Sequence, residues 1–326
     1  MSVVPLGVGI VGSGYAAQRR AEALQADHRS RLCGVAGHRS DTTAEFCQRF
    51  QIPAYAHWQA LVTAQEVDIV VVATINRDHG PIAEAALQAG KHVVVEYPLA
   101  LDYTTGQRLV ALAQRQEKLL HVEHIELLGG LHQALRQHLP AIGNVFYARY
   151  ATLQPQNPAP EKWTYHAEEF GFPLVAGLSR IHRLTDLFGA VAAITCQNRW
   201  WPRAQGAYYH ACLCQAQLRF HCGLMADILY GKGDVLQSGD RHFKLQGEQG
   251  TLIFEGDTGI LVRGEEHQNL TLGSRRGLFA QDTQAVLDHL SAGTPLYVEN
   301  TASLYALQVA SAAQASALSG QTVLLN

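Results

Sequence analysis

Residues 7–17 read GVGIVGSGYAA, and this stretch decides how the first part of the chain is expected to fold. A short apolar strand, Gly7–Val11, runs into a turn in which Gly12, Gly14 and Ala17 satisfy the spacing Gly-x-Gly-x-x-Gly/Ala. The glycines allow a tight turn and a close approach of the backbone to a pyrophosphate, which the N-terminus of the next helix favours. The motif predicts a dinucleotide site, with a purely structural turn as the alternative. The expected contacts are Gly12, Ser13, Gly14, Tyr15 and Ala16.

Strand and helix signals alternate over the 120 residues that contain this motif. Residues 68–74 (DIVVVAT) and 92–95 (HVVV) are continuous β-branched runs, which is the pattern of strands buried on both faces. Residues 81–89 have helical spacing and end at Gly90, a favourable C-cap. This alternation predicts an α/β fold with a parallel, doubly wound sheet. The other expected strands are 31–36 and 119–122, and the other expected helices are 16–24, 42–50 and 104–118.

Beyond about His124 the pattern changes to strands separated by turn residues, which predicts an α+β domain with a large, mainly antiparallel sheet. We therefore expect two domains, residues 1–123 and 124–326, with a C-terminal helix that can pack back on the first. The expected strands are 145–152, 193–200, 211–219, 223–230, 242–246, 251–255 and 259–263, and the expected helices are 128–138, 173–188, 279–291 and 302–318.

Composition narrows the class of protein. Charged residues make up only 16% of the 326 residues and the formal net charge is −3, which argues against a nucleic-acid partner. The apolar runs are too short to span a bilayer, and the N-terminus lacks a basic signal region, so we expect a cytoplasmic protein without a membrane segment. Cys212, Cys214 and Cys222 are expected to be packed thiols, with a metal site as the alternative.

The end of the second strand indicates which dinucleotide is bound. An acidic residue there would bind a ribose 2′-hydroxyl, whereas this chain has Val-Ala-Gly-His-Arg-Ser at 35–40. Arg39 and Ser40 can contact a 2′-phosphate, unless Arg39 is simply solvated. The sequence favours NADPH, with NADH as the weaker alternative.

Two further motifs carry a resemblance. Thr74-Ile75-Asn76-x-x-His79 and Glu96-Tyr97-Pro98, together with the glycine motif, are similar to the glucose–fructose oxidoreductase and inositol dehydrogenase superfamily. The resemblance covers nearly the whole chain. It implies a Rossmann domain followed by an antiparallel α/β domain whose sheet walls the substrate cleft. It also implies that Thr74, Asn76, Glu96 and Tyr97 line the nicotinamide side of the cleft and that His79 is a cofactor contact.

The chain departs from the sugar-oxidising members at three positions. Those members have Lys where this chain has Tyr97, and an Asp-x-x-x-His pair where it has Ala176 and Arg180. Alcohol oxidation needs a base for the hydroxyl proton. Tyrosine, with an ordinary pKa of about 10, is a poor base, and arginine is none. These substitutions disfavour a sugar dehydrogenase.

Residues 90–101 (GKHVVVEYPLAL), 119–130 (LLHVEHIELLGG) and 172–189 (FPLVAGLSRIHRLTDLFG) resemble the biliverdin reductases, and their cyanobacterial branch in particular. The resemblance implies that NADPH delivers hydride to the central methine carbon of biliverdin while a pyrrole nitrogen gains a proton, which gives bilirubin. Arg180 is the expected catalytic group, because it can stabilise charge on the nitrogens directly or through a water. Tyr97 is expected beside the nicotinamide, as a proton donor or as a shape-filling group.

A bilin substrate carries two propionates and a broad apolar face. Candidate carboxylate contacts are Arg183, Arg275 and Arg276, although the last two lie in a turn that can equally be solvated. Candidate stacking residues are Trp163, Tyr165 and Tyr230. His124 and Glu126 are expected to hydrogen-bond around the substrate. With His121 and Glu123 they also suggest a metal cluster, but we expect no metal, because zinc-type spacing is absent.

Two other functions remain open from the sequence. One is an NADP-dependent sugar or polyol oxidoreductase of the same superfamily, which would need a substitute for the missing base. The other is a non-catalytic regulator that binds a dinucleotide or a bilin. The sequence does not indicate whether the protein binds another protein.

Overall fold

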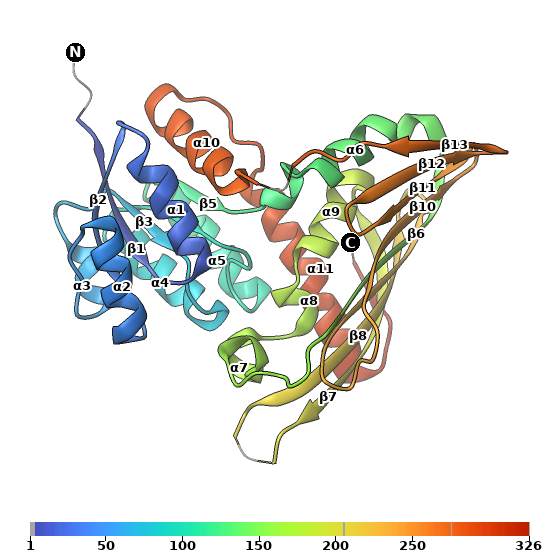
Figure 1. The fold of residues 1–326 in the computed structure, drawn as a ribbon, viewed down its shortest axis with the longest axis horizontal. Helices are drawn as coiled ribbons and strands as arrows, with labels where there is room; N and C mark the ends of the chain where they lie inside the picture. Colours follow the sequence, from blue (N-terminus) through green and yellow to red (C-terminus); the bar gives the residue numbers. More distant parts are fainter. Residues whose placement is uncertain (1–3, 205, 275, 326) are drawn as a thin grey trace. The chain divides into compact units, whose positions relative to one another are not determined.

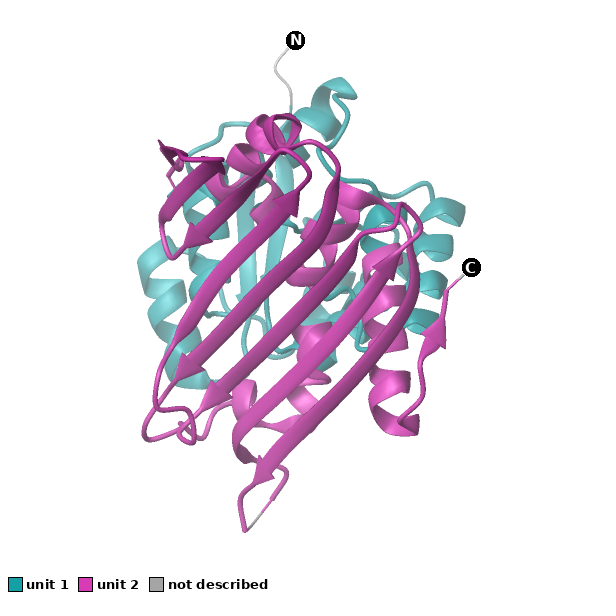
Figure 2. Ribbon diagram, turned by 90° about the vertical axis from the view of Figure 1, so that its right-hand side faces the viewer, with its two compact units in different colours: residues 1–125, 276–304 teal, residues 126–275, 305–326 magenta. Residues whose placement is uncertain are grey.

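The computed structural model describes residues 4–204, 206–274 and 276–325, which form two compact units. Unit 1 comprises residues 1–125 and 276–304, and unit 2 comprises residues 126–275 and 305–326 (Figure 2). Residues 276–304 thus return to the first unit after the chain has built most of the second. The single boundary at residues 123/124 stays a prediction.

Unit 1 is built on a parallel sheet of five strands in the order β2-β1-β3-β4-β5. The strands are β1 (Leu6–Val11), β2 (Ser30–Ala36), β3 (Ile69–Val72), β4 (His92–Val95) and β5 (Leu120–Val122) (Figure 1). Alternate residues of β3 join different cores: Ile69 and Val71 pack into one, and Val70 and Val72 into the other. Burial on both faces explains the continuous β-branched run. The predicted parallel, doubly wound sheet is confirmed.

The helices of unit 1 differ from the expected ones in two places. They are α1 (Tyr15–Gln25), α2 (Ser40–Phe50), α3 (Trp58–Thr63), α4 (Asn76–Gln88), α5 (Tyr103–Arg115) and α10 (Leu278–Ala292). The short α3 was not predicted. Helix α4 begins five residues before Pro81, where helical spacing had placed its start. Its actual first turn carries Asp78, whose charge suits a helix N-terminus.

Unit 2 contains a sheet of nine strands in the order β13-β12-β11-β10-β6-β9-β8-β7-β14. All neighbours are antiparallel except β6 and β9. The expected large, mainly antiparallel sheet is confirmed. The strands are β6 (Val145–Pro155), β7 (Val191–Pro202), β8 (Tyr209–Phe220), β9 (Met225–Gly233), β10 (Asp240–Gly247), β11 (Gly250–Glu255), β12 (Thr258–Arg263), β13 (Glu266–Leu270) and β14 (Val323–Leu324).

The two faces of this sheet have different surroundings. Along β8, Cys214, Ala216 and Leu218 are buried, whereas Gln215 and Gln217 between them are exposed. Figure 2 shows the sheet face-on, with the helices of unit 2 behind it. The helices therefore cover one face, and the period-two alternation of the sequence follows from this.

The helical segments of unit 2 include one break that we did not expect. They are η1 (Ile125–Leu127), α6 (Gly130–His138), η2 (Leu139–Ile142), η3 (Trp163–Tyr165), α7 (Ala167–Phe170), α8 (Pro173–Ala176), α9 (Ser179–Phe188) and α11 (Asn300–Ser319), of which η1 and α11 begin in unit 1. The prediction of one helix over 173–188 is wrong, because Gly177 leaves the helical conformation at φ −100° and ψ 36°. As a result of this break, a separate helix, α9, begins at Ser179, one residue before Arg180.

Two predictions from composition can be compared with the fold. No helix in the described part of the chain combines the length and apolar character that a bilayer crossing requires. Cys212 and Cys214 are buried in β8, as expected of packed thiols, whereas Cys222 is exposed, so that part of the prediction is wrong. Cys222 is exposed because it lies in the turn between β8 and β9 and not in a strand that packs on the core.

Candidate active site

The turn between β1 and α1 has the geometry that a dinucleotide needs. Gly12 has a φ of +119°, and a Cβ at this position would lie 2.0 Å from the carbonyl oxygen of Ala73, so glycine is required there. Gly14 is the N-cap of α1, with no side chain bonded to the free N–H groups, and a Cβ on it would meet nothing within 4 Å. The first N–H groups of α1 therefore face open space, which fits a pyrophosphate.

The other predicted contacts around this turn lie on the surface of unit 1. Tyr15 is exposed, and the Ser13 hydroxyl is 2.9 Å from that of Thr42, which ties the turn to the start of α2. Ser40 is the first residue of α2. Ser13 and Ser40 therefore lie at two neighbouring helix starts, as expected for residues that share one cofactor.

Two carboxylates lie at the end of β2, although the strand itself carries none. The Arg39 guanidinium is 72% exposed and pairs with Asp41. The His38 ring lies 3.0 Å from the carboxylate of Asp78. Asp78 comes from α4, so sequence reasoning about the strand end could not include it. A 2′-phosphate would therefore compete with Asp41 for Arg39.

His79 is buried and its ring contacts backbone. Its Nδ1 lies 2.8 Å from the carbonyl oxygen of Pro98, and its Nε2 lies 3.2 Å from that of Thr74. Burial lowers the pKa of His79, which favours the neutral ring. A neutral ring donates from one nitrogen only, so His79 can hydrogen-bond to only one of these two carbonyl oxygens at a time. Asn76 is also buried, at the first position of α4.

Glu96 follows β4 and is held by a buried arginine that the sequence analysis did not single out. Arg20, on the inner side of α1, is 1% exposed, and its Nε donates to Glu96 Oε1 at 3.0 Å. Its Nη1 donates to Asp282 of α10 and to the Thr283 hydroxyl. Asp282 has no exposed surface. The signal available in the sequence was an arginine at helical spacing among the apolar residues Ala17, Ala21 and Leu24, which form the buried face of α1.

Asp282 organises further groups of unit 1. The His121 ring lies 2.7 Å from Asp282 Oδ1, and the Tyr297 hydroxyl donates to the same oxygen. Burial alone would raise the pKa of Asp282, but Arg20 and His121 hold it below its usual range. Burial opposes the charge of Arg20 as well, but Asp282 and Glu96 raise its pKa. Both groups of the ion pair are therefore charged.

Tyr97 stacks on His124 within unit 1. The ring centroids are 5.7 Å apart and the ring planes differ by 2°. His124 is buried, and its backbone N–H donates to the Tyr297 hydroxyl at 3.2 Å. His124 thus fixes the orientation of the Tyr97 ring, a role that its prediction as a substrate contact did not include.

Arg180 lies over an aromatic ring on the helix-covered face of the unit 2 sheet. Its guanidinium carbon is 4.7 Å from the centroid of Tyr230 on β9. Its Nη1 makes only long contacts of 3.5 Å, with the Gly177 carbonyl and the Ser179 hydroxyl. Its Nε is buried and has no hydrogen-bond partner among the described residues. The aromatic face holds this cation while leaving N–H groups available.

Arg183 lies one helical turn further along α9 and is 5% exposed. Its Nε and Nη1 are buried and have no hydrogen-bond partner in the described ranges. Neither Arg180 nor Arg183 forms an ion pair with a described carboxylate. Two guanidinium groups without a neutralising partner suit an anionic or electron-rich ligand.

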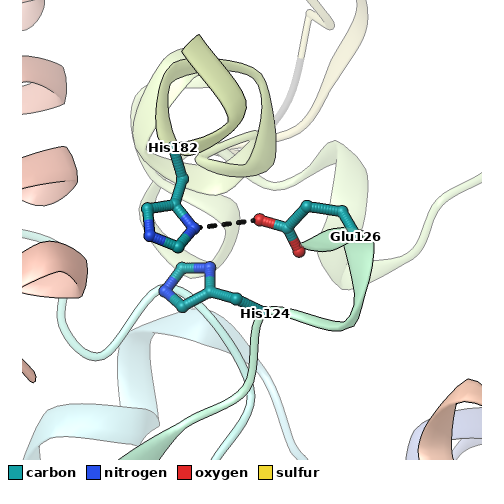
Figure 3. Close-up of side chains that lie close together, drawn as sticks. All are labelled: His124, Glu126 and His182. Atoms are coloured by element: carbon teal, nitrogen blue, oxygen red, sulfur yellow. Dashed lines mark hydrogen bonds and ion pairs between the residues drawn. The ribbon is translucent and has the colours of Figure 1, made fainter. Parts of the chain in front are cut away.

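Glu126 and His182 form a second pair in unit 2. Figure 3 shows the His182 ring turned toward the Glu126 carboxylate, and Nδ1 and Oε1 are 3.3 Å apart. His182 is buried on α9, between the two arginines in sequence. The expectation that no metal is bound here stays a prediction.

The predicted stacking residues fall into two groups. Trp163 is half-buried at the start of η3, and Tyr230 lies beneath Arg180. Tyr165 is fully buried, with its ring 5.4 Å from that of Tyr209 and its hydroxyl bonded to Gln156, so its prediction as a stacking surface is wrong. Of the two carboxylate candidates in the turn, Arg276 is exposed and Arg275 lies outside the described residues.

Tyr165 instead helps to enclose Lys232, which is 5% exposed. The Lys232 ammonium lies 3.4 Å from the ring centroid of Phe170, 4.7 Å from that of Tyr165 and 5.5 Å from that of Tyr209. It donates to the carbonyl oxygen of Thr164. Burial lowers the pKa of Lys232 to about 7.

Comparison with known proteins gives two family matches. Residues 6–124 match the model of an oxidoreductase family with an NAD-binding Rossmann fold, and residues 138–325 match that of an oxidoreductase family C-terminal alpha/beta domain. A crystal structure of biliverdin reductase from Synechocystis sp. PCC 6803, in complex with biliverdin and NADP+, is 56% identical. The match covers 96% of this chain and 99% of that chain, with a TM-score of 0.95.

Curated relatives give weaker matches. Biliverdin reductase A of Mus musculus is 33% identical over 195 residues, 59% of this chain and 62% of that protein. UDP-N-acetylglucosamine 3-dehydrogenase of Acidithiobacillus ferrooxidans is 30% identical over 156 residues, 48% of each chain. The chain thus spans about three fifths of the length of the first of these relatives and about half of the second. The resemblance to the biliverdin reductases, inferred from the segments around Tyr97 and Arg180, is confirmed.

Proposed function

The chain belongs to the oxidoreductase family with an NAD-binding Rossmann fold, and we propose that within this family it reduces biliverdin to bilirubin with NADPH. One observation carries the proposal: the 56% identity, over 99% of its chain, to a biliverdin reductase that binds biliverdin and NADP+. The residues of both units agree with it, because the helix start of unit 1 suits a dinucleotide and unit 2 offers cations where a dehydrogenase would need a base.

Unit 1 supplies the cofactor side of the proposed site. Gly12 to Ala16 would receive the pyrophosphate at the start of α1, and Arg39 with Ser40 would bind the 2′-phosphate. Thr74, Asn76 and Glu96 would lie along the nicotinamide, with the buried ring of His79 close to the backbone of Thr74 and Pro98. When bound, NADPH supplies the hydride that adds to the central methine carbon of the bilin.

Unit 2 supplies the side chains that would stabilise negative charge on the substrate during the reduction. Negative charge develops on a pyrrole nitrogen as the methine carbon is reduced, and a fixed guanidinium stabilises it best where water is excluded. Arg180 fills this role, because its stem is held by Tyr230 and its Nε is unpartnered in the described structure. Arg183, Trp163, Glu126 and His124 are the proposed substrate contacts, and Tyr97 packs beside the nicotinamide.

The test is to mix the protein with NADPH and biliverdin and to follow the visible spectrum. Conversion of the biliverdin band into that of bilirubin supports the proposal. A bilin that binds and stays unchanged would instead indicate a regulator. Absence of any spectral response, with turnover of a sugar or polyol and NADP+, would indicate the sugar oxidoreductase.

A further inference from the structure

Lys232 is a buried cation of unit 2 that the proposed reaction does not use. It lies on β9, directly opposite Cys212 of β8 and Gln154 of β6. Because side chains two residues apart in a strand share a face, Lys232 is on the same face as Tyr230, the ring that carries Arg180. No carboxylate among the described residues forms an ion pair with Lys232. A buried lysine is rarely left without an acid, so other groups must hold the charge.

Aromatic rings and one carbonyl oxygen surround the ammonium instead. Nζ lies 3.4 Å from the ring centroid of Phe170, and the rings of Tyr165 and Tyr209 lie further out. Nζ also donates to the backbone carbonyl oxygen of Thr164, which accepts a second bond of 2.7 Å from the Tyr209 hydroxyl. The attraction between a cation and a ring face is strongest where water is excluded. The charge of Lys232 therefore stabilises the contacts of β9 with η3 and α7.

The chain that Lys232 contacts from β9 carries Trp163. Thr164 follows Trp163 directly in η3, and Phe170 is the last residue of α7. The ring centroids of Trp163 and Phe170 are 6.2 Å apart, with 46° between the ring planes. Lys232 thus contacts both the next residue of the chain and a ring on which Trp163 packs. Trp163 itself is half-buried, so part of its indole stays accessible to a ligand.

We infer that Lys232 is a positioning residue for the bilin: its ammonium fixes the segment 163–170 to the sheet and thereby holds the Trp163 indole for stacking on a tetrapyrrole. The inference rests on the proposed function, in which Trp163 contacts the substrate. Lys232 does not itself touch the bilin, because the rings and the Thr164 carbonyl enclose Nζ and the residue is only 5% exposed. It acts through Trp163.

The charge of Lys232 changes near neutral pH, which gives the inference a second observable. Burial is the main cause that lowers its pKa to about 7. Of the charged groups that face it, Lys162 beside η3 and Arg180 of α9 act in the same direction, whereas Cys212 opposes them. Burial raises the pKa values of the two enclosing tyrosines, so both phenols stay neutral. The ammonium is therefore present below about pH 7 and is lost above it, and its hold on the segment should weaken as the pH rises.

The first experiment measures the Kd of biliverdin at about pH 6 by absorbance titration of the wild type, Lys232→Met and Lys244→Met. Methionine packs well against aromatic rings, so the substitution removes the charge and the N–H donor with little loss of packing. Lys244 is half-buried on β10, on the opposite face of the same sheet, and serves as the matched control. Loss of a desolvated cation–π contact should raise the Kd of biliverdin about tenfold in Lys232→Met and leave it unchanged in Lys244→Met. The Kd of NADPH should stay unchanged in both variants.

The pH dependence and a double variant separate positioning from a general loss of stability. The difference in the Kd of biliverdin between the wild type and Lys232→Met should be largest at about pH 6 and should shrink by about pH 9, as the ammonium loses its proton. In a Trp163→Leu background, Lys232→Met should cause no further loss of affinity, because the two residues act together. Equal Kd values of the wild type and Lys232→Met at about pH 6, or a full effect of Lys232→Met in the Trp163→Leu background, would overturn the inference.

The second experiment needs neither cofactor nor substrate. The amides of Tyr165, His166 and Phe170 are hydrogen-bonded to carbonyl oxygens of residues 162, 163 and 166, so their hydrogen–deuterium exchange reports how firmly the segment is held. At about pH 6, peptides that cover the segment should exchange faster in Lys232→Met than in the wild type or Lys244→Met. Equal exchange of this segment in the wild type and Lys232→Met would contradict the inference. Faster exchange, as expected, in a protein whose wild type neither binds nor reduces biliverdin would refute the proposed function instead.

Discussion

The buried Arg20–Asp282 pair makes a direct prediction for the variant Asp282→Asn. Asparagine keeps the size of the side chain but removes the charge that Arg20, His121 and Tyr297 contact. Breaking a buried ion pair by removing one partner costs about 3–5 kcal/mol, since the other charge stays buried. Arg20 still has Glu96 at 3.0 Å, so we expect the lower end, about 3 kcal/mol. This corresponds to roughly a hundredfold change in the folding equilibrium.

Asp288→Asn is the matched control on the same helix. Asp288 pairs with Arg29 at 2.6 Å, but the two side chains are 37% and 19% exposed. Pairs near solvent contribute at most about 1 kcal/mol, so this variant should lose little stability. The double variant Arg20→Met/Asp282→Leu removes both buried charges. It should be more stable than Arg20→Met alone or Asp282→Leu alone, because each of these leaves one buried charge without its partner.

Urea denaturation at neutral pH, followed by far-ultraviolet circular dichroism, measures these differences as changes in the free energy of unfolding. The reasoning fails if Asp282→Asn costs no more than Asp288→Asn. It also fails if the double variant loses as much free energy of unfolding as Arg20→Met and Asp282→Leu lose together, because the two groups would then not be coupled.

Three further predictions concern other parts of the chain. The Lys232 pKa is lowered to about 7 in the folded protein, so between about pH 7 and 10.5 the unfolded chain binds a proton that the folded chain does not. The free energy of unfolding should therefore rise more steeply with pH over this range in the wild type than in Lys232→Met. Gly12→Ala should destabilise unit 1, because its Cβ would lie 2.0 Å from a carbonyl oxygen, whereas Gly14→Ala should keep the wild-type Tm and weaken NADPH binding in a fluorescence titration. Arg39→Ala should weaken binding of NADPH but not of NADH in the same titration, and Asp41→Asn should strengthen NADPH binding, because Arg39 would no longer be shared with a carboxylate.

Local sequence patterns predicted the fold at positions where a single physical requirement selects the residue type. The glycine at position 12 is required by its φ, and the β-branched run of β3 is required by burial on both faces, so both could be read from the sequence. The alternation of buried and exposed residues along β8 also has one physical reason, since helices cover one face of the sheet.

Contacts between distant segments could not be predicted in this way. Asp282 meets Arg20 although 262 positions separate them, and Asp78 reaches the end of β2 from a different helix. The break at Gly177 depends on a single dihedral angle that helical spacing does not encode.

The most direct test of the account follows the hydride itself. The protein is given biliverdin and NADPH that carries deuterium at the transferable position of the nicotinamide, and the product is analysed by mass spectrometry and proton NMR. The account predicts bilirubin with one deuterium at the central methine-derived carbon and none elsewhere on the carbon skeleton. Bilirubin without deuterium at this carbon, or biliverdin recovered unchanged, would contradict it.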